Sequence, residues 1–162
     1  MAAEQRPHIV LIHSDQHRAD CLGCAGHPVL RTPNLDRLAA EGTHFTHAFT
    51  PTAICSPERA SLMTGMWPTQ HGCLSIPGAE IYRPARGDLP LVSRLLSQAG
   101  YRLGFVGKFH AEFDREPTEW GFDEYVGLGE YDAWREAQGL PPMPRENGWF
   151  GETDPHIAPG QS

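Results

Sequence analysis

The stretch DLPLVSRLLSQAGYRLGFVGK, residues 88–108, holds a complete helix–strand unit. Apolar residues recur at helical spacing through residues 88–100, and Gly100 provides a stop for the helix. The following segment YRLGFVGK, residues 101–108, is short and rich in strand-forming residues, which predicts a strand that ends at Lys108. The stretch therefore predicts a helix that leads directly into a strand of a sheet.

The same alternation of helix and strand runs through the regular part of the chain. HIVLI, residues 8–12, is a continuous apolar run that predicts a fully buried strand of a parallel sheet. THFTHAF, residues 43–49, alternates between polar and apolar residues and predicts a second strand. Helices are predicted over residues 32–42 and residues 57–64. Strands that alternate with helices are typical of the α/β class.

The helix predicted over residues 32–42 has recognisable ends and one apolar face. Thr32 is a capping residue type, and Pro33 suits the first turn of a helix. Gly42 is a typical stop. The predicted inner face consists of Leu35, Leu38 and Ala39.

A chain of 162 residues is expected to form about one domain and to bury a hydrophobic core. Regular patterns are confined to residues 1–135. Residues 136–162 are rich in proline and glycine and show little periodicity, which predicts a loop or a tail.

The composition favours a soluble globular protein, with 40% hydrophobic and 20% charged residues. The net charge of −7 argues against a nucleic acid or an anionic membrane as partner, but it permits a small anionic substrate held by local cations. No apolar run is long enough to span a membrane, and the amino terminus lacks the basic region of a secretory signal. A cytoplasmic location is therefore expected. Four cysteines are too few for a disulfide scaffold.

Asp15 and Gln16 follow the first predicted strand. Open α/β sheets bind ligands at the carboxyl ends of their strands. A carboxylate and an amide carbonyl are hard oxygen ligands, which suit Ca²⁺ or Mg²⁺ better than zinc. The pair equally fits a polar strand end or a helix cap, so both interpretations stay open on the residues alone.

Cys55 precedes a predicted helix whose first turn contains Pro57 and Arg59. Ser56 is a candidate cap. The amino terminus of a helix directs N–H groups and partial positive charge toward a bound anion, and Arg59 adds a permanent cation. This arrangement suits a tetrahedral oxyanion beside Cys55. A buried structural cysteine, or a thiol nucleophile activated by the helix, fits the same spacing.

Lys108 and His110 lie at the end of the strand predicted over residues 101–108. They would point to the same side if the chain stayed extended. A lysine for charge and a histidine for proton transfer fit a site that cleaves an anion. A solvated lysine beside an incidental histidine is the alternative.

In chain order, these segments resemble the sulfatase family of the alkaline-phosphatase-like superfamily, from about residue 7 to residue 128. The segment CSPERASLMTG, residues 55–65, is similar to the family signature Cys-x-Pro-x-Arg, which is followed by a helix ending in Thr-Gly. AGYRLGFVGKFH, residues 99–110, is similar to its Gly-Lys-Trp-His segment, with Phe109 in place of tryptophan. WGFDEYVG, residues 120–127, is similar to a structural segment that follows.

The resemblance implies an alkaline-phosphatase-like fold, a mostly parallel sheet flanked by helices, of which this chain is similar to the amino-terminal part. It implies a hydrolase that cleaves sulfuric esters. Cys55 would be oxidised to formylglycine by a formylglycine-generating enzyme, and the hydrated aldehyde would be the nucleophile. Asp15, Gln16 and the modified Cys55 would be ligands of Ca²⁺, or of Mg²⁺ or Mn²⁺.

The resemblance also implies roles for three further residues. Arg59 would hold the hydrated aldehyde, Lys108 would neutralise the sulfate oxygens, and His110 would orient the diol or the ester by a hydrogen bond. A small sulfate ester would be the substrate.

Three features depart from the usual pattern of the family. Many members have Asp-Asp where this chain has Asp15-Gln16, and the Asp-Gln pair resembles a subset that includes phosphonate monoester and diester hydrolases. Glu58 stands where serine is common. Family members are several hundred residues long, so the 162-residue chain alone is expected to show little catalysis. A phosphonate or phosphate diester hydrolase and a non-catalytic fragment are the alternative functions.

Overall fold

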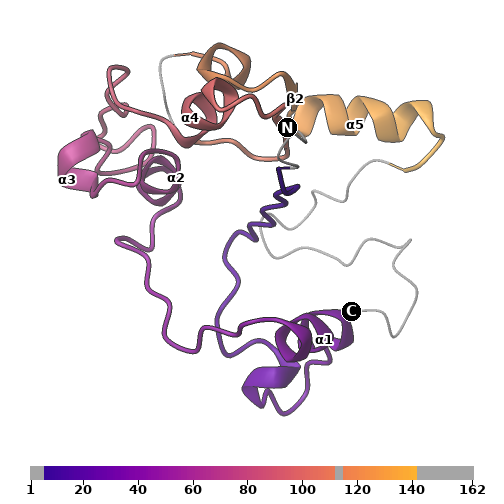
Figure 1. The fold of residues 1–162 in the computed structure, drawn as a ribbon. Helices are drawn as coiled ribbons and strands as arrows, with labels where there is room; N and C mark the ends of the chain where they lie inside the picture. The colour runs from indigo at the N-terminus through magenta and orange to yellow at the C-terminus, as the bar shows by residue number, and fades with distance from the viewer. Residues whose placement is uncertain (1–5, 112–114, 142–162) are drawn as a thin grey trace, which may run out of the picture. The chain divides into compact units, whose positions relative to one another are not determined.

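The computed structural model describes residues 6–111 and 115–141. The chain divides into two compact units, residues 1–46 with 157–162, and residues 47–156. Each unit is described by itself, with the element labels of Figure 1. No helix among the described residues is long and apolar enough to cross a membrane.

The first unit is built around the 3₁₀ turn η1 (Gly23–Ala25) and the helix α1 (Pro33–Glu41). The helix confirms the prediction, with Pro33 at its start and Gly42 after its end. Thr32 occupies the cap position, but its hydroxyl makes no hydrogen bond that caps the helix. The hydroxyl instead accepts from the N–H of Gly23 and donates to the Asp36 carboxylate at 2.8 Å, so it ties η1 to α1.

The strands predicted over residues 8–12 and 43–49 are wrong: both segments are irregular in the structure. Residues 8–12 are exposed throughout, with Val10 at 82% and Ile12 at 87%. An apolar run becomes a parallel strand only where neighbouring strands accept its backbone hydrogen bonds and helices cover its faces. Among the described residues, neither segment has a neighbouring strand. The predicted inner face of α1 is also largely exposed to solvent, with Leu38 64% exposed.

The second unit contains most of the regular structure. In chain order, its elements are α2 (Cys55–Thr64), α3 (Pro68–His71), α4 (Val92–Gln98), β1 (Gly104–Val106), η2 (Pro117–Trp120), β2 (Glu124–Val126) and α5 (Leu128–Ala137). The helices α2 and α4 and the strand β1 confirm predicted elements with shifted ends, whereas α3, β2 and α5 were not predicted. Helix α5 runs past residue 135, and residues 142–162 of the predicted tail lie outside the described part of the chain.

The strands β1 and β2 pair in parallel, with Phe105 opposite Tyr125. Beside this sheet, the largest buried cluster consists of Met63, Leu91, Ala111 and Trp120, with Phe109 and Phe122 packed against it. The cluster joins α2 to the residue before α4 and to the segment between β1 and β2. Helices around a parallel strand pair confirm an incomplete α/β fold.

Trp120 is the largest fully buried side chain of this cluster, at 1% exposure. Its carbonyl accepts from the Ser93 hydroxyl at 2.6 Å, and the Arg94 guanidinium lies 4.4 Å from its ring. We expect Trp120→Ala to lower the free energy of unfolding by about 3–5 kcal/mol, because it empties the centre of the cluster. Urea denaturation followed by circular dichroism measures this loss.

Trp134→Ala is the matched control, since Trp134 is 52% exposed. A surface substitution of this kind is expected to change the free energy by less than about 1 kcal/mol. Equal losses in the two variants would show that Trp120 is not the centre of the core.

Candidate functional site

The signature segment forms the first turns of α2, which begins at Cys55 itself. Ile54 is the extended residue before the helix, so Ser56 lies inside the first turn and is not the cap that the sequence predicted. Glu58 also lies in this turn, where a carboxylate is favourable for the helix dipole. Cys55 is a partly buried free thiol. Cys55 and Arg59 are four residues apart, so they lie on the same side of the helix.

Arg59 is a buried cation, 8% exposed. Its guanidinium donates a hydrogen bond to the backbone carbonyl of Lys108 at 2.5 Å. A buried charge needs hydrogen-bonding partners to offset the loss of water, and a carbonyl dipole is one such partner. The contact joins the signature helix to the segment with the second predicted pair of catalytic residues.

His110 makes a second connection between the same two segments. Its Nε2 lies 3.4 Å from the Ser56 hydroxyl, a long hydrogen bond between residues 54 positions apart. Lys108 and His110 are both partly buried. The structure therefore brings Lys108 and His110 to the first turns of α2, which contain Arg59. The catalytic roles of these three residues stay a prediction.

The GKFH segment, residues 107–110, is not an extension of β1. Its chain leaves the strand at Gly107, which has φ of 106°, and His110 has φ of 45°. Positive φ is favourable for glycine and uncommon for histidine. The same-side argument for Lys108 and His110 therefore fails, because it assumed an extended chain. Their proximity to α2 comes from the turn.

Two contacts fix the GKFH segment to the sheet. The Gly107 N–H donates to the Val126 carbonyl at 2.8 Å. The Phe109 ring packs edge-on against Phe105, with centroids 5.2 Å apart, and against Phe122. An aromatic residue at position 109 thus fills the place that the resemblance gives to tryptophan. Its packing against Phe105 and Phe122 anchors the neighbouring residues Lys108 and His110.

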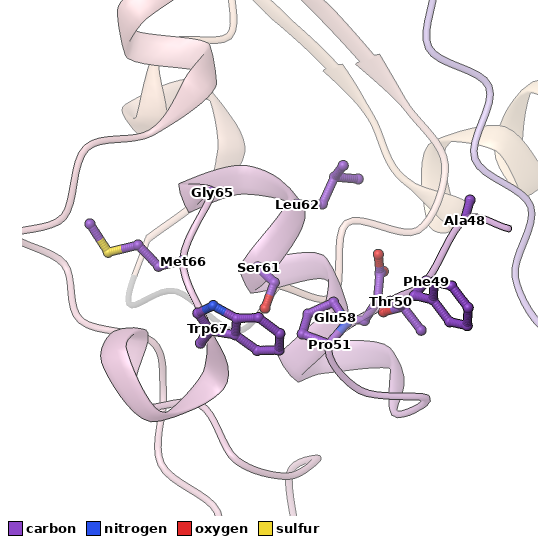
Figure 2. Close-up of a pocket in the computed structure, with 10 residues that line it drawn as sticks. All are labelled: Ala48, Phe49, Thr50, Pro51, Glu58, Ser61, Leu62, Gly65, Met66 and Trp67. Atoms are coloured by element: carbon purple, nitrogen blue, oxygen red, sulfur yellow. The ribbon is translucent and has the colours of Figure 1, made fainter. Parts of the chain in front are cut away.

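Glu58 lines a pocket of about 710 Å³ beside α2, together with Phe49, Leu62 and Trp67 (Figure 2). None of the four predicted catalytic residues is among the described residues that line it. Glu58 thus lines a space that the four predicted catalytic residues do not line.

The family model described as Sulfatase matches residues 7–154. The chain belongs to the sulfatase family. It is 40% identical to arylsulfatase A of Homo sapiens over 136 residues, which are 79% of this chain and 26% of that protein. The chain thus spans about a quarter of the length of this curated sulfatase.

Solved structures of the family give the same result for the fold. A protein solved in complex with its substrate D-glucosamine-2-N,6-O-disulfate has a TM-score of 0.64 and 31% identity, over 75% of this chain and 23% of that one. The phosphonate monoester hydrolase of Agrobacterium radiobacter has a TM-score of 0.67 and 28% identity, over 84% of this chain and 29% of that one. These sulfatase-like neighbours confirm the predicted alkaline-phosphatase-like α/β class, incomplete here.

Asp15 and Gln16, the predicted metal ligands, belong to the first unit, whereas Cys55 belongs to the second. Both ligands are exposed, and Gln16 has φ of 53°. Their meeting with Cys55 stays a prediction. Ca²⁺ takes six to eight oxygen ligands. The described residues contain no group of three or more histidine, cysteine, aspartate or glutamate side chains that fits a metal ion. By themselves they therefore do not fit a complete cation site.

Ser56 and His71 are the two residues of this region whose place sequence reasoning missed. Ser56 was interpreted as a cap, and His71 was not singled out at all. A histidine that contacts a helix ten residues earlier leaves no periodic signal in the sequence, because the turn between them sets the contact.

Proposed function

We propose that the protein is a sulfuric ester hydrolase whose nucleophile is a formylglycine made from Cys55. The supporting observation is the joining of the signature helix to the GKFH segment by the hydrogen bonds of Arg59 and His110. These contacts hold a buried guanidinium next to the helix turn that begins at Cys55. The family membership supports the same activity.

The proposed chemistry explains why a cysteine must be modified. Hydration of the aldehyde gives one carbon two hydroxyl groups. One oxygen attacks the ester sulfur and loses its proton, and the alcohol leaves with the electrons of its S–O bond and takes up a proton. The second hydroxyl then loses its proton and re-forms the C=O bond while sulfate departs. A thiol or a serine has no second oxygen with which to release the sulfate.

The residues of this chain would divide the remaining tasks. Arg59 would hold the diol, Lys108 would place positive charge at the sulfate oxygens, and His110 would orient the diol or the ester. Preorganised charge of this kind is worth most where water is excluded, and Arg59 is already buried. Asp15 and Gln16 would contribute to a divalent cation site that needs further ligands.

A formylglycine-generating enzyme is the proposed maturation partner, and a small sulfate ester is the proposed substrate. The 162-residue chain alone is proposed to have little activity, since its described residues do not complete a cation site.

Mass spectrometry of the tryptic peptide from Leu38 to Arg59 tests the modification directly. We expect that co-expression with a formylglycine-generating enzyme removes the sulfur of Cys55 and leaves an aldehyde that a hydrazide reagent traps. The same peptide from a Cys55→Ala variant gives no trapped product and is the control. A fully retained thiol in the co-expressed protein would reject formylglycine as the nucleophile.

A phosphonate monoester or diester hydrolase on the same scaffold is the second candidate. Two observations favour it: Gln16 follows Asp15, and the phosphonate monoester hydrolase of Agrobacterium radiobacter is similar over 84% of this chain. Comparing kcat/KM for an aryl sulfate and an aryl phosphonate, with the full gene product, separates the two candidates. The better substrate by more than about tenfold identifies the reaction.

A further inference from the structure

His71 is a fully buried polar residue directly beside the signature helix. It is the last residue of α3, and its exposure is 0%. The helices α2 and α3 lie side by side (Figure 1). His71 is not among the residues to which the proposed function gives a role, so its burial needs a separate explanation.

Both ring nitrogens of His71 have defined partners. Nε2 lies 2.9 Å from the hydroxyl of Ser61, which is itself buried in α2. On the other side, the N–H of Cys73 donates to Nδ1 at 3.2 Å.

These partners fix the protonation state of the ring. Because the Cys73 N–H is a donor, Nδ1 must be the acceptor without a proton. Burial lowers the pKa of His71, which favours the neutral imidazole at pH 7. A neutral imidazole has one N–H, so Nε2 then carries the proton and donates it to the Ser61 hydroxyl.

The turn after α3 creates this arrangement. Gly72 has φ of 87°, a conformation that favours glycine, and it folds the chain back so that the Cys73 N–H meets the ring of His71. The Arg86 N–H holds the same turn by donating to the His71 carbonyl at 2.9 Å. Cys73 is fully buried beside Ala60 of α2. The turn therefore holds the ring at Nδ1, while Nε2 contacts α2.

We infer that His71 is a positioning residue that fixes the first two turns of α2, and with them Cys55 and Arg59, through its Nε2–H. The contact reaches Ser61, which lies two residues after Arg59 in the helix. The GKFH segment holds the same turns through Ser56 and Arg59. Two separate segments, the GKFH segment and the turn that contains His71, thus hold the first two turns of the signature helix. As far as it concerns turnover, this inference rests on the proposed function.

The test uses the reactivity of the unmodified Cys55 thiol, which does not depend on formylglycine. The 162-residue chain is treated with iodoacetamide under native conditions, and peptide mass spectrometry follows each cysteine separately. We expect His71→Leu, which fills the space without a donor, to raise the alkylation rate of Cys55 about tenfold. His71→Gln keeps an N–H donor for Ser61, and we expect a rate within about threefold of the parent.

Cys24 is exposed and serves as the internal reference, whose rate should not change in either variant. A rise at all four cysteines in His71→Leu would show general unfolding and would overturn the positioning role. Equal rates at Cys55 in His71→Gln and His71→Leu would overturn it as well, because packing alone would then explain the site.

In the full gene product, the same variants are expected to lower kcat with KM nearly unchanged, His71→Leu by about tenfold and His71→Gln by less. Absence of sulfate ester hydrolysis in the parent protein would reject the proposed function. It would leave the alkylation result, and the positioning role, standing by themselves.

Discussion

Replacing Cys55 by alanine in the full gene product is expected to lower kcat for an aryl sulfate by at least about 10³-fold. The reason is the loss of the only proposed nucleophile, at the first residue of α2. Steady-state assays on protein co-expressed with a formylglycine-generating enzyme measure the effect. Cys55→Ser should be equally inactive in turnover, because serine has a single oxygen and cannot expel the bound sulfate.

Cys24→Ala is the control, since Cys24 is another free and more exposed thiol. Its kcat is expected within about twofold of the parent value. If Cys55→Ala kept a tenth or more of the parent activity, neither formylglycine nor the plain thiol would be the nucleophile.

Replacing Arg59 by alanine is expected to have the second largest effect, on stability and activity together. Arg59 is 8% exposed and donates to the Lys108 carbonyl, so its loss leaves a cavity and a carbonyl without this charged donor. We expect the free energy of unfolding to fall by about 2–4 kcal/mol. For the full gene product, kcat should fall by at least about 10²-fold, because a preorganised cation is lost.

Arg59→Lys separates the two contributions. Lysine keeps the charge but lacks the planar fork of donors of arginine. It should therefore recover part of the activity but little of the stability that comes from the hydrogen bond to the Lys108 carbonyl. Arg102→Ala is the surface control: the ion pair of Arg102 with Glu124 is exposed, with side chains 79% and 65% accessible, and should change stability by less than about 1 kcal/mol. Indistinguishable denaturation midpoints for Arg59→Ala and Arg102→Ala would refute the structural role of Arg59.

The elements that the sequence predicted correctly carry their signals locally. Helix α1 has a proline start and a glycine stop, and α4 followed by β1 has an apolar period that changes at Gly100. The strands predicted over residues 8–12 and 43–49 failed because a strand also needs neighbours, which the sequence pattern alone does not provide. The strand β2 has only three residues, too few for a readable alternation.

The residue types of the candidate site were predictable, but their contacts were not. The residues themselves singled out Cys55 and Arg59 at a helix start and Lys108 and His110 at a strand end, and the resemblance gave all four their roles. The contact from Arg59 to Lys108 depends on a turn at Gly107 that no helix or strand period describes. The support from His71 depends likewise on the conformation of Gly72. Sequence patterns report periodic elements, whereas this site is held by turns.

The hydrogen bonds between α2 and the GKFH segment also have a consequence for protein synthesis. The groups that hold its first turn through Arg59 and Ser56 come from Lys108 and His110, 49 and 54 positions later in the chain. At a synthesis rate of ~5–20 residues per second, they emerge from the ribosome about 2–11 s after the signature. During this interval Cys55 lies in a chain that the GKFH segment does not yet hold. A maturation enzyme that needs an extended cysteine peptide would have those seconds in which to act.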